Sequence, residues 1–319
     1  FAAAILGFLV LCRHIRAKLR DSWVETVFSD LTREINFSRV MILFHFVLGV
    51  FWVVSTQVQA DADQWYCAEI ASRQMFPDYD FIDYMPGGYA YNYPYQSGLI
   101  LVMSLIFRLF GSMNYTAFQI CNVIALLIVD ISLMKTAEYL ESPSAKKVSS
   151  AMLVLFWPIL FYTVFVYGNL IGLAFGTTAL FFQYRYFKNR RFRDIVISCL
   201  MIGFAVMIKT NYLIFLIAML IFLVLDFIVT FRKKTVLYAV LAVVCYVLGA
   251  MGPVTLVVYR AALMWALEYQ RLRSYPWVSG NPDSLRDGGI IITMRICIST
   301  VDTMRRLLRI WQRQIYKNV

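Results

Sequence analysis

The chain has 319 residues, of which 61% are hydrophobic and 15% charged, and its formal net charge is +11. Soluble domains carry about 25% charged residues, and several apolar runs here approach the roughly 20 residues that cross a bilayer. The composition therefore excludes a soluble domain, and the continuous apolar runs argue against a transmembrane β-barrel. Basic residues lie in short blocks between these runs, so we assign them to membrane orientation and expect no nucleic-acid partner.

Cysteine and histidine usage argues against two further classes of site. The six Cys are far apart and contain no CxxC motif, which predicts no disulfide framework. The two His, His14 and His45, fall on different segments. A His-based metal site is therefore not expected.

Residues 1–39 are predicted to hold the end of a membrane segment and an interfacial amphipathic helix. Apolar residues such as Trp23 and Val27 recur at helical spacing, and Ser22 with Glu25 forms a capping-box pattern. A soluble linker helix is the alternative. The chain begins within an apolar run and ends in a basic amphipathic stretch, which predicts a fragment of a longer protein.

Residues 40–258 are predicted to form a polytopic transmembrane domain. The expected spans are 40–60, 115–137, 148–166, 169–187, 194–209, 211–231 and 235–258. Asp130 and Asp226 are expected to face the cytoplasmic interface. Residues 259–319 are expected to form an external or juxtamembrane C-terminal segment, which we interpret as truncated. The predicted fold class is an all-α polytopic helical bundle.

The apolar run 97–110 decides the topology. It is too short for a comfortable span and carries Arg108. If it does not cross, the basic blocks at 13–20, 146–147, 188–193 and 232–234 all lie on the cytoplasmic side, as the positive-inside rule favours. We therefore predict a helix that dips into the outer leaflet, and one large external loop over residues 61–114.

That loop contains the strongest candidate for chemistry. Six of the nineteen carboxylates fall between residues 61 and 83, and Asp61 and Asp63 directly follow the span 40–60. A carboxylate fixed there can act as a general base on an acceptor hydroxyl or amine. The alternative is a solvated start of the loop. Glu69 faces either the same cavity or solvent.

Three further acids, Asp78, Asp80 and Asp83, stand in the segment PDYDFID. The Asp-x-Asp spacing can hold a divalent ion such as Mg or Mn through oxygen ligands. Turn formation is the competing interpretation. We therefore assign no residue as a metal ligand and no certain cofactor.

Sugar and phosphate contacts have separate candidates. Tyr93, Tyr95 and Gln96 suit a sugar, because an aromatic face packs on the ring and polar groups bond its rim, although Tyr at a membrane surface also forms interfacial belts. Lys209 interrupts an apolar run at a predicted outer turn and is either a phosphate anchor or a snorkelling cation. The remaining candidates for substrate binding are Arg260, Arg271, Arg273 and Asn169.

The segment QADADQWYCAEIA…YNYPYQSGLILVMSLIFRLFG, together with VYGNLIGLAFG and IKTNYLI, resembles the GT-C glycosyltransferases, in particular bacterial members related to protein O-mannosyltransferases. The resemblance covers roughly residues 40–260. It implies a bundle with juxtamembrane helices in the first external loop, a polyprenyl-phosphate-linked sugar donor, and a catalytic Asp that maps best to Asp63, with Asp61 as the alternative.

The sequence therefore predicts a membrane glycosyltransferase of the hexosyl- or mannosyltransferase kind. It would transfer a sugar from a polyprenyl-phosphate donor to a glycan, lipid or protein acceptor on the outer face of a bacterial plasma membrane. One base and one displacement predict inversion. The alternatives are a flippase or transporter of a lipid-linked saccharide and a non-catalytic membrane assembly protein.

Overall fold

The computed structural model of the protein describes residues 37–76, 79, 81–84, 87–139, 149–150, 152–153 and 155–273. The predicted interfacial helix before residue 37 and the chain after residue 273 lie outside this part. All regular structure in the described ranges is helical. The predicted all-α class is confirmed.

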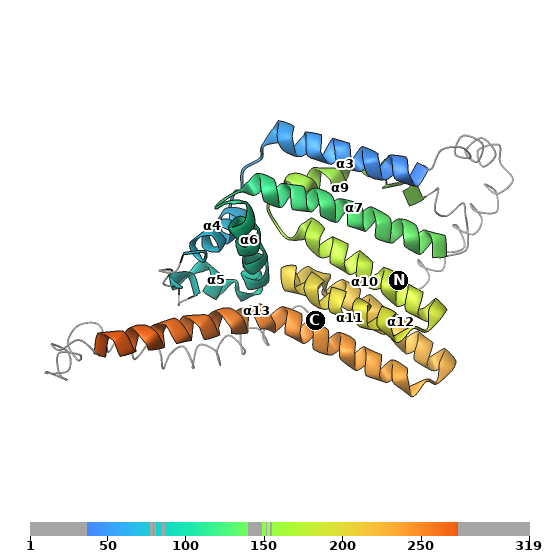
Figure 1. The fold of residues 1–319 in the computed structure, drawn as a ribbon. Helices are drawn as coiled ribbons and strands as arrows, with labels where there is room; N and C mark the ends of the chain where they lie inside the picture. The colour runs from blue at the N-terminus through green and yellow to red at the C-terminus, as the bar shows by residue number, and fades with distance from the viewer. Residues whose placement is uncertain are drawn as a thin grey trace.

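The long helices lie side by side as a bundle (Figure 1). They are α3 (Phe37–Thr56), α7 (Tyr115–Tyr139), α10 (Asn169–Asn189), α11 (Phe192–Ile208), α12 (Leu213–Thr230) and α13 (Lys233–Arg273). Helix α10 packs between α7 and α11, α3 packs on α7, and α13 packs on α11. Gly203 and Gly249 permit the close crossing of α11 and α13, since a Cβ on Gly249 would lie 2.1 Å from the Gly203 carbonyl oxygen.

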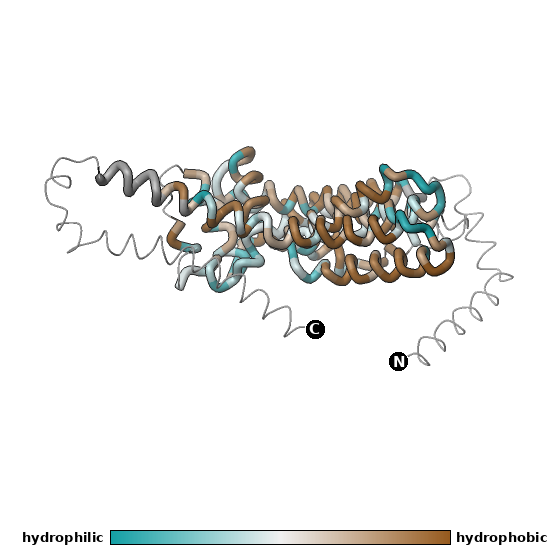
Figure 2. Tube along the Cα trace, turned by 90° about the horizontal axis from the view of Figure 1, so that it is seen from below, coloured by the Kyte–Doolittle hydropathy of each residue, from teal (hydrophilic) through white to brown (hydrophobic). Residues whose placement is uncertain are grey.

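Within the described residues, four helices are long and apolar enough to cross a membrane: Arg39–Thr56, Tyr115–Tyr139, Thr210–Thr230 and Lys233–Ala261. Figure 2 shows hydrophobic residues along the bundle and hydrophilic residues at its two ends. The predicted spans at 169–187 and 194–209 form helices α10 and α11 but miss this criterion. Helix α10 ends in a polar segment, and α11 has only 17 residues.

The predicted span at 148–166 is interrupted in its described second half. There the chain forms the short helix α9 (Trp157–Phe161) followed by the 3₁₀ turn η3 (Tyr162–Val164). Pro158 lies in the first turn of α9, where its missing N–H costs no helical hydrogen bond. A proline at this place favours a new helix start over a continuous helix.

The segment between α3 and α7 gathers at one end of the bundle (Figure 1). It contains α4 (Asp63–Arg73), η1 (Ile82–Tyr84), α5 (Tyr89–Asn92), η2 (Pro94–Gln96) and α6 (Ser97–Phe110). The pieces Ile82–Asn92 and Pro94–Phe110 would make a fifth span only as one element bent by 99°. In Figure 1, α6 lies across the end of the bundle; that it does not cross the membrane stays a prediction.

One buried ion pair lies between α3 and α7. Nδ1 of His45 is 2.7 Å from Oδ2 of Asp130, and these side chains are 3% and 0% exposed. The expectation that Asp130 faces the cytoplasmic interface is therefore wrong. Asp226 is also mostly buried, and it pairs with Arg190 at 2.7 Å near the end of the bundle opposite α4–α6.

Candidate functional site

A tight turn after α3 sets the position of Asp63. Ala62 has φ 48°, a backbone conformation that is unfavourable for a residue with a side chain. Its N–H donates to Oδ1 of Asp61 at 2.7 Å, so Asp61 stabilises this turn. Asp63 then begins α4, where the N-terminal end of a helix favours negative charge.

The Asp63 carboxylate is exposed and has an aromatic partner. Its neighbour is Tyr89 on α5, whose hydroxyl accepts from the Cys67 thiol at 3.9 Å. Burial raises the pKa of the Tyr89 hydroxyl above its ordinary value, and the charges of Cys67 and Asp63 act in the same direction. Burial likewise raises the pKa of the Cys67 thiol to about 12. At neutral pH both groups stay protonated, which leaves Asp63 as the proton acceptor of this group.

Lys209 follows the last residue of α11 and is half-buried. Its ammonium group donates to Oδ1 of Asn169, at the start of α10, and lies 4.3 Å from the ring centre of Tyr167. Within the described part of the chain it has no carboxylate partner. Burial lowers the pKa of Lys209. A cation held by a neutral amide and a ring can still accept an anion as ligand.

Tyr167 and Gln96 connect the Lys209 group with the Asp63 group. The Gln96 side-chain amide, on η2, donates to the Tyr167 hydroxyl. Burial raises the pKa of Tyr167 to about 12, against the opposite effect of the bond from Gln96, and the Asp63 charge contributes to the rise. Burial and then the charge of Asp63 also raise the pKa of Tyr95. The charge of the Asp63 carboxylate thus acts on the pKa of both tyrosines.

Two glycines allow these groups to converge. A Cβ on Gly98 would lie 1.9 Å from the backbone oxygen of Met207, and one on Gly168 would lie 2.4 Å from Cγ2 of Ile208. Without side chains there, α6 and the start of α10 both reach the end of α11. Additional polar contacts fix the connecting loop, since the N–H of Val166 donates to the Gln64 side chain at 2.9 Å.

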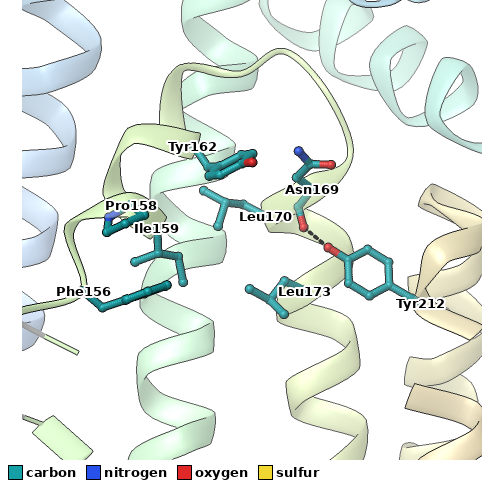
Figure 3. Close-up of a pocket in the computed structure, with 8 residues that line it drawn as sticks. All are labelled: Phe156, Pro158, Ile159, Tyr162, Asn169, Leu170, Leu173 and Tyr212. Carbon is teal, nitrogen blue, oxygen red and sulfur yellow. Dashed lines mark hydrogen bonds between the residues drawn. The ribbon is translucent and has the colours of Figure 1, made fainter. Parts of the chain in front are cut away.

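An apolar pocket adjoins this network (Figure 3). Its volume is about 280 Å³, and it lies between α9, the first turns of α10 and η4 (Thr210–Tyr212). Its lining consists of Phe156, Pro158, Ile159, Tyr162, Asn169, Leu170, Leu173 and Tyr212. The Tyr212 hydroxyl donates to the backbone oxygen of Asn169 (Figure 3). Asn169 therefore borders the pocket and also contacts Lys209.

Other sequence candidates lie apart from this network. Glu69 is 3.8 Å from Arg73 in an i,i+4 pair. Arg260 is exposed on α13, and no described contact joins it to Lys209. The side chains of Arg271 and Arg273 lie outside the described residues.

The acids after α4 have a structural partner where they are described. Asp83 lies 2.7 Å from Arg73 and accepts from the Tyr79 hydroxyl at 2.9 Å, which ties the loop to α4. Asp78 and Asp80 lie outside the described residues. Among the residues that the structure describes, no cluster of three His, Cys, Asp or Glu could hold a metal ion.

Residues 98–251 match the family model described as dolichyl-phosphate-mannose-protein mannosyltransferase. This match supports a GT-C membrane glycosyltransferase. The matched segment includes Asn169 and Lys209 but begins after Asp63 and Gln96. No curated protein and no solved structure is significantly similar to the chain.

Three groups of this network could not be singled out from the sequence. Tyr167 lies between the predicted spans 148–166 and 169–187, and its place beside Asn169 was the available signal. Tyr89 stands among five tyrosines with no pattern that singles it out. Gln64 carries no sequence signal, because its role depends on a backbone N–H over one hundred residues later.

Proposed function

We propose that the protein transfers a sugar from a polyprenyl-phosphate-linked donor to an acceptor, with Asp63 as general base. The observation that carries this proposal is the network of Lys209, Tyr167 and Gln96, together with the hydrogen bond from the N–H of Val166 to Gln64, the residue after Asp63. It brings a cation and a carboxylate to one end of a membrane bundle. The similarity of residues 98–251 to mannosyltransferases supports the same chemistry.

The donor phosphate binds at Lys209. The ammonium group lacks a carboxylate partner in the described residues, and a phosphate oxygen can replace Asn169 or join it as acceptor. The adjoining pocket is lined mainly by apolar side chains, so it accepts the first part of a prenyl chain (Figure 3). A phosphate site next to an apolar pocket fits the two parts of a lipid-linked donor.

The acceptor reacts on the Asp63 side of the sugar. An acceptor hydroxyl passes its proton to Asp63 while its oxygen forms a bond with the anomeric carbon. The bond from that carbon to the phosphate oxygen breaks, and polyprenyl phosphate leaves with the electron pair. Lys209 stabilises the charge that develops on the phosphate. One displacement inverts the anomeric configuration. The predicted outer face of a bacterial plasma membrane provides the setting.

Two conservative variants test the base. Asp63→Asn keeps the shape of the side chain and removes its proton acceptor, so turnover should fall by roughly 10²- to 10⁴-fold. Asp61→Asn is the matched control, because an amide oxygen can still accept from the Ala62 N–H. Purified protein with equal thermal melts should be compared on one polyprenyl-phosphate donor. Near-wild-type turnover in Asp63→Asn would refute the assignment.

A flippase or transporter would need polar groups available along the bundle. Several buried polar side chains of the bundle are instead engaged with the protein backbone. Asn122 donates to the carbonyl oxygens of Thr163 and Phe165, and Gln183 donates to that of Met219 at 2.7 Å. These bonds leave the His45–Asp130 pair as the feature that a proton-coupled transporter could use.

A further inference from the structure

Four aromatic side chains form a continuous row beside Asp63. The ring centres of Trp65 and Tyr66 are 5.2 Å apart, and those of Tyr66 and Tyr89 are 5.0 Å apart with only 11° between the ring planes. Tyr93 extends the row at 4.9 Å from Tyr89. The row joins α4 to the segment of α5, and we refer to these four residues as the aromatic row.

Three of the four side chains of the aromatic row are exposed. Trp65, Tyr66 and Tyr93 are 41%, 47% and 43% exposed. Helix α4 packs on α6 through other residues, among them the fully buried Cys67 and Ala68. The packing of α4 on α6 therefore does not depend on the rings of the aromatic row. Three exposed aromatic side chains in one row, joined through the half-buried ring of Tyr89, form a candidate binding surface.

The position of the row relates it to the reaction. Tyr66 follows Asp63 by three residues on α4, so the two side chains lie on neighbouring positions of one helix face. Trp65 follows Asp63 by two residues on the same helix. The donor contacts proposed above are made by other residues, Lys209 and Asn169. A molecule bound on the row would therefore approach Asp63 as an acceptor does.

We propose that the aromatic row binds a saccharide, so that the acceptor of the transfer is a glycan chain. Aromatic faces pack on the C–H faces of sugar rings, and neutral hydroxyls at the ring edges bond sugar hydroxyls. A polypeptide acceptor that bound by strand addition would need an exposed strand edge. The described residues of this end contain short helices and turns and no strand. This inference rests on the proposed function in one respect, namely that the bound saccharide is the acceptor of the transfer.

Equilibrium binding tests the inference without turnover. Linear tetrasaccharides of mannose, of glucose and of N-acetylglucosamine should be titrated against the full chain in detergent, with saturation-transfer NMR as readout. At least one should bind, and Trp65→Ala and Tyr93→Leu should each weaken it by roughly two- to twelve-fold, the value of one ring contact. Trp157→Ala is the matched control, because Trp157 is 47% exposed on α9, away from the row.

Three results would overturn the inference. The first is that none of the tetrasaccharides binds to wild-type protein. The second is that binding is unchanged in both row variants when their thermal melts equal that of the wild type. The third is that a Ser/Thr-rich decapeptide binds in their place and depends on Trp65, which would make the acceptor a polypeptide. Donor turnover is measured separately, so its failure would count against the proposed function and leave the saccharide titration standing.

Discussion

Lys209 gives a prediction whose size follows from its surroundings. The ammonium group is half-buried between the Asn169 amide and the Tyr167 ring. A charge-assisted hydrogen bond to a phosphate contributes about 1.5–3 kcal/mol, which corresponds to roughly 10- to 150-fold in affinity. Lys209→Met should weaken binding of farnesyl phosphate by this factor, measured by titration of purified protein. The Met side chain fills similar space, so the thermal melt should change little.

The same residue predicts a pH dependence. Because burial lowers the pKa of Lys209, its charge is lost at a lower pH than that of an ordinary lysine. Farnesyl phosphate should therefore bind more weakly as the pH rises towards 10. Between the folded and the unfolded pKa of Lys209, the unfolded chain binds more protons than the folded chain, so the contribution of Lys209 to stability increases as pH rises. The loss of farnesyl phosphate binding therefore cannot be explained by unfolding that is caused by Lys209.

Lys209→Arg is the control for charge, because a guanidinium group stays protonated throughout this range. This variant should bind farnesyl phosphate with a flatter pH profile. If Lys209→Met binds as the wild type does, or if the wild-type profile is as flat as that of Lys209→Arg, the lysine is not the phosphate anchor and only lies at the membrane surface.

Gly98→Ala should reduce turnover by roughly 100-fold, because the new Cβ would move α6 away from α11. Gly252→Ala is the control and should leave turnover unchanged, since its Cβ would meet nothing within 4 Å. Equal losses of turnover in both variants would contradict this explanation. Asp130→Ala should cost about 3–5 kcal/mol of stability by leaving buried His45 unpaired; a double Leu replacement of both residues should recover much of the melting temperature. Asn189→Cys should react with an impermeant maleimide only after the membrane is permeabilised; labelling of intact cells would reverse the predicted topology.

The course of the chain through the bundle could be predicted from hydropathy and charge. Hydropathy predicted a short helix at 97–110, and the structure forms α6 over Ser97–Phe110. The basic blocks at 188–193 and 232–234 favour a helix that does not cross the membrane, which stays a prediction. Periodicity and length carry this information because each membrane helix satisfies its own backbone. The interruption of the predicted span 148–166 near Pro158 could not be predicted without knowledge of how α9 packs.

The connections within the site could not be predicted. Lys209 was identified as a cation in an apolar setting, but its contacts with Asn169 and Tyr167 depend on how α10 and α11 pack. Spacing placed Asp130 near a helix end, whereas its partner His45 is 85 residues earlier. Long-range side-chain pairs leave no periodic signal in one sequence. Asp61 and Asp63 were equivalent by position and differ in the structure only by their partners.

The central claim is sugar transfer that depends on Asp63. The direct measurement is release of polyprenyl phosphate and formation of a glycosylated product by purified protein, with polyprenyl-phosphate mannose as donor and a linear mannose tetrasaccharide as acceptor. We expect product with wild-type protein and with Asp61→Asn, and a loss of roughly 10²- to 10⁴-fold with Asp63→Asn. Equal product formation by wild type and Asp63→Asn would contradict the account.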